Sequence, residues 1–474
     1  MRCSCVILIV LALSSVLSAS PREYSFDLWD WTTPCRDLAT FKKWAADLKS
    51  IGVTRLEISA PWNLMEPAPG KYDVSFVTDR LAVAKSLGLG LRVRINSYFF
   101  ATPDWYKGDR WCDMNGKPPT GTPVPVSMCD PRFWPEYGTL CTKLAAACRG
   151  ENVYFNSFIG VHAELKWSDW WSYDASTLKL WRETIRNRPA WLVDLVGNAK
   201  LPDVPPIPGP THGSPDVSPT SIAWIAFREW VWRDAERRFN EAIRAGDPNA
   251  KTSAPLGESY RAASAQMSNL DYFGLSRGAS QIVHSYDFFW HTKDEPWNAA
   301  AAVASFQGIS GIRDLVFEFD GAAMLEKLGY SDARQIEIAK AVLAEGAGIK
   351  VANNSYDVNR LPSSWPVLVE FGKLVREAGE APPPPPRDQT VLLFISKWCD
   401  YCFRESSEWV HEKQFATWHE MTSKGGPVRI ICEDNLDEDL SGYRALVVAF
   451  CPPQVLPNKS RLALNALLRD LPKK

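Results

Sequence analysis

The order of predicted elements constrains the fold of this chain more than any single motif does. Between residues 24 and 377, short apolar segments typical of strands alternate with segments of helical periodicity. We expect strands at 24–29, 53–59, 89–95, 153–161, 251–255, 281–286, 314–319 and 349–352. We expect helices at 37–50, 78–87 with Thr78 as N-cap, 135–148, 221–245, 298–309, 331–345 and 365–377. Such alternation predicts a parallel sheet, and eight units predict a closed (β/α)8 barrel. An open doubly wound sheet would need a glycine-rich turn after the first strand, and none is seen there.

A run of five prolines, 382–386, marks a domain boundary. Such a run fits neither a helix interior nor a central strand and forms an extended spacer. We therefore divide the chain into a leader at 1–20, a barrel at 21–380, a linker at 381–387 and a small α/β domain at 388–474. In the small domain we expect strands at 390–395, 428–431 and 445–450, and a helix at 415–423. The proline- and glycine-rich stretch 199–220 predicts an ordered loop or a lid.

The first twenty residues have the layout of a secretory signal. Arg2 precedes an apolar run at 6–17, and small residues follow at 18–20. The run is shorter than the ~20 residues that a bilayer span needs, and a membrane anchor or lipid tether is the alternative. We expect a secreted or periplasmic protein. The formal net charge of −2 gives no broad basic surface for nucleic acid or an anionic membrane.

Nine of the eleven cysteines remain once Cys3 and Cys5 leave with the leader, so at least one stays unpaired within the chain. A disulfide between Cys112 and Cys129 is plausible, because they flank a polar loop. Cys141 and Cys148 are two helical turns apart, ~10 Å along the axis, which is too far for a bridge. They are expected to be core thiols.

Cys399 and Cys402 follow a strand, as the cysteines of a thioredoxin-like redox motif would. The simpler interpretation is a structural disulfide or a pair of half-buried thiols. The six histidines are scattered and no second Cys-x-x-Cys exists, so no zinc site is predicted. We expect neither a metal nor an organic cofactor.

Carboxylates at strand ends are the candidates for catalysis, because a barrel of this kind places its active site there. Glu164 follows the fourth strand and Glu318 ends the seventh. Each has a structural alternative, as the ion-pair partner of Lys166 or of Arg313. The rivals of Glu318 as nucleophile are Asp320, Glu258 and Asp287.

Two converging carboxylates are what the hydrolysis of a glycosidic bond needs. One protonates the leaving oxygen, and the other attacks the anomeric carbon or activates water. Tryptophan is abundant, with 21 residues, and flat rings suit stacking on sugars. The candidate substrate-binding residues are Trp62, Asn96, His162, Trp167, His284, Tyr286 and Trp290.

These motifs resemble the clan A glycoside hydrolases, whose catalytic glutamates lie on strands 4 and 7. Residues 62–73, which read Trp-Asn-Leu-Met-Glu-Pro-Ala-Pro-Gly-Lys-Tyr-Asp, resemble the segment after strand 2 in family 42 β-galactosidases. His284-Ser285-Tyr286 resembles the clan's His-x-Tyr, whose tyrosine hydrogen-bonds the nucleophile. The tail resembles the family's amidotransferase-like, flavodoxin-like second domain in shortened form. The resemblance implies Glu164 as acid/base, Glu318 as nucleophile, an oligo- or polysaccharide substrate and a possible homo-oligomer.

One position departs from the clan's pattern. The clan has an asparagine before the acid/base that contacts the sugar 2-hydroxyl, and this chain has Ala163 there. Such contacts strengthen in the transition state and contribute several kcal/mol. His162 and Asn96 are the candidates to replace it. The alternative function is a catalytically inactive barrel that still binds carbohydrate.

Overall fold

The computed structural model describes residues 22–28, 37–97, 101–118, 126–158, 172–208, 211, 213–257, 274, 276, 278–286, 295–320, 331–352, 361–403 and 408–471. Within these ranges, no helix is long and apolar enough to cross a membrane.

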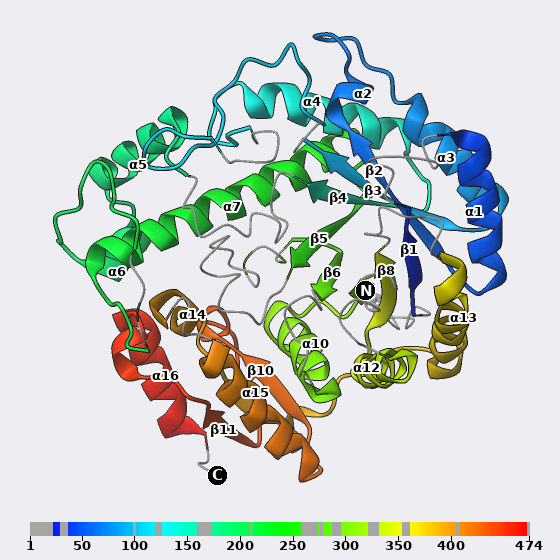
Figure 1. The fold of residues 1–474 in the computed structure, drawn as a ribbon. Helices are drawn as coiled ribbons and strands as arrows, with labels where there is room; N and C mark the ends of the chain where they lie inside the picture. The colour runs from blue at the N-terminus through cyan, green and yellow to red at the C-terminus, as the bar shows by residue number, and fades with distance from the viewer. Residues whose placement is uncertain are drawn as a thin grey trace, which may run out of the picture.

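Eight parallel strands close into a barrel in sequence order, as the alternating pattern predicts (Figure 1). The closure is made by β1 pairing with both β2 and β8. The strands are β1 (Tyr24–Asp27), β2 (Arg55–Pro61), β3 (Gly90–Asn96), β4 (Val153–Phe158), β5 (Lys251–Gly257), β6 (Gln281–Tyr286), β7 (Leu315–Asp320) and β8 (Gly348–Ala352).

Helices connect these strands, and most of them surround the barrel (Figure 1). They are α1 (Leu38–Ser50), α2 (Trp62–Met65), α3 (Ser75–Ser86), α4 (Phe133–Ala147), α5 (Ala175–Asn187), α6 (Ala190–Val196), α7 (Pro219–Gly246), α10 (Pro296–Ser310), α12 (Asp332–Ala344) and α13 (Leu361–Ala378). Side-chain caps fix several starts: Asp37 accepts from the Thr40 amide at 2.8 Å, and Asp174, Ser218 and Ser331 cap α5, α7 and α12.

The predicted helices differ from the observed ones at one start and by three additional helices. Thr78 is not an N-cap, because α3 already begins at Ser75, after Val74. Helices α5 and α6 lie between β4 and α7, where no helix was expected, and α2 is a further short helix after β2. Within the proline-rich stretch 199–220, no helix is described before α7 begins at Pro219.

Alternation along the strands sends apolar side chains outward and charged ones inward. On β1, Tyr24 and Phe26 face the helices, and the Tyr24 hydroxyl donates to the carbonyl of Leu368 on α13 at 2.9 Å. The intervening Asp27 faces the barrel axis, as its ion pairs with β3 and β8 show. The main apolar core therefore lies between barrel and helices.

A small parallel sheet follows the prolines, in the order β10-β9-β11. Its elements are η5 (Arg387–Gln389), β9 (Val391–Phe394), α14 (Lys397–Phe403), α15 (Glu408–Ser423), β10 (Val428–Ile431), η7 (Glu433–Asn435), β11 (Ala445–Val448), η8 (Pro453–Val455) and α16 (Asn458–Asp470). All three predicted strands are confirmed. Helices α14 and α16 were not predicted.

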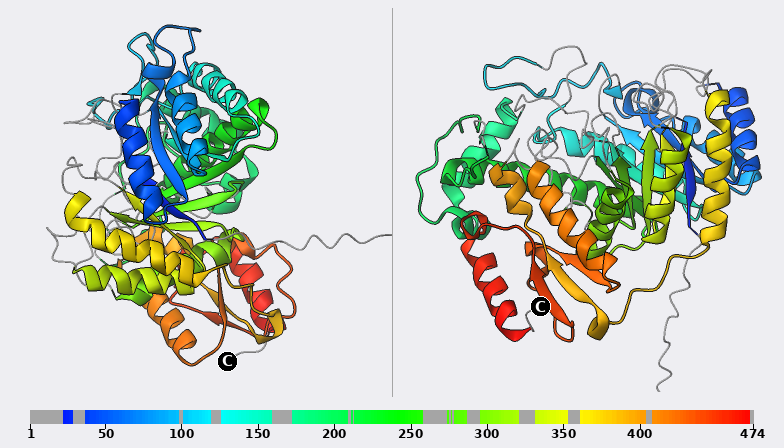
Figure 2. Two further views of the ribbon diagram at one scale, coloured as in Figure 1. Left: turned by 90° about the vertical axis from the view of Figure 1, so that its right-hand side faces the viewer. Right: turned by 60° about the horizontal axis from the view of Figure 1, so that its bottom comes forward.

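The small domain packs against α10 and α7 of the barrel (Figures 1 and 2). Arg429 Nε donates to the Gly308 carbonyl at 3.0 Å, and Asn435 Nδ2 donates to the Ile309 carbonyl at 2.9 Å. Gly308 is required here, because a Cβ would lie 2.3 Å from the Ile430 carbonyl oxygen. The domains thus share a close contact as well as a linker.

A buried polar cluster lies where α7 meets the small domain. Glu433 accepts hydrogen bonds from the Ser396 hydroxyl and, at 3.1 Å, from the Lys397 amide. Lys397 Nζ pairs with Asp434 at 2.9 Å, and Glu229 of α7 is buried beside them. We call Glu229, Ser396, Lys397, Glu433 and Asp434 the interdomain cluster.

Candidate active site

Glu318 is the one proposed catalytic residue whose side chain the structure describes. It lies two residues before the end of β7, next to Lys350 of β8 in the sheet register. The flanking Phe317 and Phe319 face outward, where Phe319 contacts Phe371 of α13. Glu318 therefore points into the barrel, and its side chain is 4% exposed.

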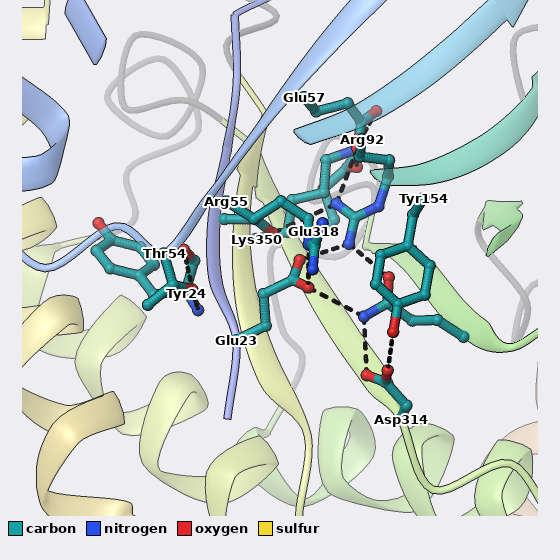
Figure 3. Close-up of polar contacts among 12 residues, drawn as sticks. Glu23, Tyr24, Thr54, Arg55, Glu57, Arg92, Tyr154, Asp314, Glu318 and Lys350 are labelled. Carbon is teal, nitrogen blue, oxygen red and sulfur yellow. Dashed lines mark hydrogen bonds and ion pairs between the residues drawn. The ribbon is translucent and has the colours of Figure 1, made fainter. Parts of the chain in front are cut away.

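The carboxylate of Glu318 forms an ion pair with the ammonium of Lys350 (Figure 3). The Lys350 side chain has no exposed surface. Its Nζ also donates to Glu57 Oε1 at 2.9 Å and lies 3.8 Å from Asp27 Oδ2. One ammonium therefore faces carboxylates from β7, β2 and β1.

Two arginines of β3 complete this inner cluster, which we define as Asp27, Glu57, Arg92, Arg94, Glu318 and Lys350. Arg94 donates to Asp27 at 3.0 Å and also to Glu57. Arg92 donates to Glu57 at 3.0 Å. Each carboxylate in the cluster thus contacts at least one cation.

A second polar layer lies nearer the amino ends of the strands (Figure 3). Glu23 accepts from Arg55 at 2.8 Å and from Arg92. Gln281 accepts from Arg92 at 2.6 Å and donates to Asp314 at 2.8 Å. Arg92 joins this layer to the inner cluster.

The cations decide which inner carboxyls are ionised. Burial alone would raise the pKa of Glu57, but Arg94, Lys350 and Arg92 together hold it well below its usual range. In the same way, Arg92 and Arg55 overcome burial and lower the pKa of Glu23 to about 2. Asp27 differs: burial, helped by the charges of Glu57 and Glu318, outweighs Arg94 and raises its pKa to about 7. A group that titrates near neutrality therefore lies in the same cluster as Glu318.

Several predicted site residues lie outside the described ranges: Glu164, His162, Trp167 and Trp290, together with the rival nucleophiles Glu258 and Asp287. The backbones of Tyr286 and Asp320 end β6 and β7, while their side chains are not described. The convergence of Glu164 and Glu318 therefore stays a prediction.

Asn96 is placed near the inner cluster. It ends β3, two residues after Arg94 on the same inward face, and it is 1% exposed. Its Nδ2 lies 3.5 Å from the Ser59 hydroxyl. This position is consistent with the proposed substrate contact.

His284 and Trp62 are not placed as substrate contacts. His284 is buried on the outer face of β6, where its ring contacts Phe306 of α10 and Phe317. Trp62 has no exposed surface and packs against Trp105 and Tyr106, so it offers no face to a sugar. Both positions serve packing instead.

The segment from Trp62 to Asp73 forms a closed turn. Glu66 is fully buried, and its carboxylate accepts from the Trp62 indole at 2.8 Å and from the Gly70 amide at 2.9 Å. The Trp105 indole donates to the Glu66 carbonyl at 2.9 Å. The motif that suggested the family therefore shapes the loop after β2.

No disulfide joins the described cysteines, so the bridge suggested between Cys112 and Cys129 is not formed. Cys141 and Cys148 are buried, as predicted. Cys399 and Cys402 are fully buried in α14. Thiol exchange requires an accessible thiolate, so this burial does not favour a redox module.

Sequence reasoning missed five residues of the inner cluster: Asp27, Glu57, Arg92, Arg94 and Lys350. The search for carboxylates covered the ends of strands 4 to 7 and left out Asp27 at the end of strand 1. The sequence does indicate these residues, because charged residues interrupt two otherwise apolar strands. These strands are 91–95, Leu-Arg-Val-Arg-Ile, and 348–352, Gly-Ile-Lys-Val-Ala. Charges at alternate positions of a strand share one face.

Solved structures of other proteins share this fold. A β-galactosidase from the Antarctic haloarchaeon Halorubrum lacusprofundi matches with a TM-score of 0.65 at 12% identity, over 90% of this chain and 68% of that one. The β-galactosidase of Rahnella sp. R3 gives 0.60 at 13%, over 91% and 67%. A GH5_18 protein from Streptomyces cattleya, in complex with GlcNAc, gives 0.54 at 14%, over 91% and 99%.

At these identities the similarity shows the fold alone, a (β/α)8 barrel that this chain shares with the β-galactosidases and the GH5_18 protein. No family model matches the sequence, and no curated protein does. The predicted fold is therefore confirmed, and the activity has to be argued from the site.

Proposed function

We propose that the protein is a retaining β-glycosidase with Glu318 as nucleophile and Glu164 as acid/base. The observation that carries the proposal is the position of Glu318. It is inward-facing, ion-paired and near the carboxyl end of β7, in a fold shared with β-galactosidases. The carboxyl ends of the strands are where barrels of this kind hold their catalytic groups.

The reaction proceeds in two displacements. Glu318 attacks the anomeric carbon while Glu164 protonates the leaving oxygen, which gives a glycosyl ester on Glu318. Glu164 then removes a proton from water, the water attacks the anomeric carbon, and the carboxylate of Glu318 leaves. The anomeric configuration is retained.

The substrate is proposed to be a β-linked oligo- or polysaccharide, with β-galactosides as the first to test. Several similar structures are β-galactosidases, and one GH5_18 structure contains GlcNAc. Asn96, His162, Trp167 and Trp290 are the proposed sugar contacts, and Tyr286 is proposed to orient Glu318. Self-association is part of the proposal and can be measured by light scattering.

The decisive experiment combines kinetics with trapping. Wild type, Glu318→Gln and Glu164→Gln are assayed on aryl β-glycosides, with exposed Glu412→Gln as the matched control. A 2-deoxy-2-fluoro glycosyl fluoride should label Glu318 in a peptide digest, and azide should rescue Glu164→Gln on an activated substrate. If wild type neither hydrolyses the panel nor is labelled, yet binds oligosaccharide, the protein is the carbohydrate-binding barrel instead.

Export is a separate part of the proposal. We propose that residues 1–20 direct secretion and are then removed. N-terminal sequencing of the protein recovered outside the cell should begin near residue 21. An intact leader, or a product that stays with the membrane fraction, would contradict it.

A further inference from the structure

We propose that Lys350 is the positioning residue of the nucleophile: it fixes the carboxylate of Glu318 and keeps it ionised for attack. This inference rests on the proposed function and goes beyond it, because it assigns a role to a residue of β8. The geometric basis is the direct Lys350–Glu318 ion pair inside the barrel.

The position of Lys350 is fixed from two sides. Its backbone pairs with Glu318 on one strand and with Ser25 on the other. Its ammonium is held by Glu57 at 2.9 Å. Because Glu57 is in turn held by Arg92 and Arg94, the ammonium is anchored while it contacts Glu318.

The described charges around the Lys350–Glu318 pair come from β1, β2 and β3. Asp27 of β1 lies 3.8 Å from the ammonium, Glu57 of β2 contacts it, and Arg94 of β3 contacts both of those carboxylates. Among these residues, Lys350 is the cation that forms an ion pair with Glu318. An adjacent cation favours the ionised form of a carboxyl, and ionised is the form that attacks.

Lys350 acts on both displacements without exchanging a proton. When Glu318 becomes an ester, its negative charge is lost and the ammonium remains paired with Glu57. When water cleaves the ester, the electron pair of the C–O bond returns to Glu318. The ammonium then stabilises the charge that develops on the departing carboxylate, as a preorganised cation does.

The test uses Lys350→Met, the charge-keeping Lys350→Arg, and Arg55→Met as matched control. Arg55 is also a buried barrel cation, but it contacts Glu23, the Leu91 carbonyl and Asn152. In Lys350→Met the acid limb of kcat/KM should move up by about one pH unit or more. On a dinitrophenyl glycoside, kcat should fall on the order of 100-fold. Lys350→Arg should restore most of the acid limb, and Arg55→Met should keep it.

A purely structural lysine would lower the yield of folded protein without moving the acid limb. If Lys350→Met does not fold, Lys350→Met/Glu57→Gln carries the test, because it removes one charge of each sign. An active, Glu318-labelled wild type with an unmoved acid limb in the folded variant overturns this inference alone. A wild type that is neither active nor labelled overturns the proposed function, and this inference with it.

Discussion

The inner cluster of the barrel and the interdomain cluster are both buried groups of acids and bases, yet they differ in charge balance. In the inner cluster, Asp27, Glu57 and Glu318 face Arg92, Arg94 and Lys350, three acids against three cations. In the interdomain cluster, Glu229, Glu433 and Asp434 face Lys397, with Arg233 3.7 Å from Asp434.

The consequence appears in the ionisation of the glutamates. The pKa of Glu57 is held well below its usual range, because its three cations overcome burial. Burial raises the pKa of Glu229 to about 7, although Lys397 and Arg233 oppose it. Burial likewise raises the pKa of Glu433 to about 7. Burial favours the neutral acid in both places, and the supply of cations decides the outcome. Glu57 is therefore ionised at neutral pH, while Glu229 and Glu433 are partly neutral there, as is Asp27, the inner acid whose pKa burial raises to about 7.

The largest expected effect follows from neutralising one acid in each cluster. Glu57→Gln leaves Arg92, Arg94 and Lys350 buried with too little negative charge, which should cost about 3–5 kcal/mol. Glu433→Gln at pH 6 replaces a largely protonated acid, and its amide oxygen can still accept from Ser396. It should change stability by less than about 1 kcal/mol. Urea unfolding of both variants at pH 6 checks this, and equal losses would erase the contrast between the clusters.

The pH dependence of stability gives the next largest effect. The folded pKa values of Glu229 and Glu433, about 7, exceed the ordinary glutamate value of 4.5. Their contribution is therefore complete below about pH 4.5 and is lost as the pH rises through 7. Glu23 has the opposite sign, because its pKa is lowered to about 2. Its contribution is present above about pH 4.5 and is lost as the pH falls through 2.

Several buried acids contribute to the pH dependence near neutrality, because Asp27 and Glu236 also have pKa values of about 7. Glu229→Gln isolates the contribution of Glu229. Between pH 5 and 7, the free energy of unfolding of Glu229→Gln should fall less steeply than that of wild type. The two slopes should differ by about 1 kcal/mol per pH unit. Exposed Glu412→Gln serves as the control and should run parallel to wild type. A Glu229→Gln curve parallel to wild type would show that Glu229 is already charged.

A smaller effect should come from the contact between the domains. Gly308→Ala places a methyl against the backbone of Ile430, which should cost about 1–3 kcal/mol as an overpacked contact. Gly426→Ala is the control, because a Cβ there meets nothing within 4 Å. Equal unfolding curves for the two variants would mean that the domain contact accommodates the added methyl group without a loss of stability.

The sequence predicted the barrel because its signal is local and repeated. Each strand and its helix carry their own period, so an error such as Thr78 moves one boundary and leaves the topology unchanged. Packing between distant segments carries no such local signal. Trp62 and His284 matched short motifs, but contacts with Trp105 and with Phe306 assign both to packing.

Lys350 shows the complementary failure. Its pairing with Glu318 depends on the register of β7 (315–320) and β8 (348–352), which are separated in the sequence. Inspecting carboxylates alone could not find it. Marking every charge on an inward strand position would have found Asp27, Glu57, Arg92, Arg94 and Lys350 together.

The smallest expected effect lies in a partly exposed aromatic contact at the same domain boundary. Trp297 at the start of α10 stacks on His419 of α15, with ring centroids 4.8 Å apart and an interplanar angle of 15°. Stacked rings contribute about 0.5–1.5 kcal/mol beyond the area they bury. A double-mutant cycle with Trp297→Ala and His419→Ala should give a coupling energy in that range. A coupling of zero would mean that the rings add nothing to the stability of the domain contact.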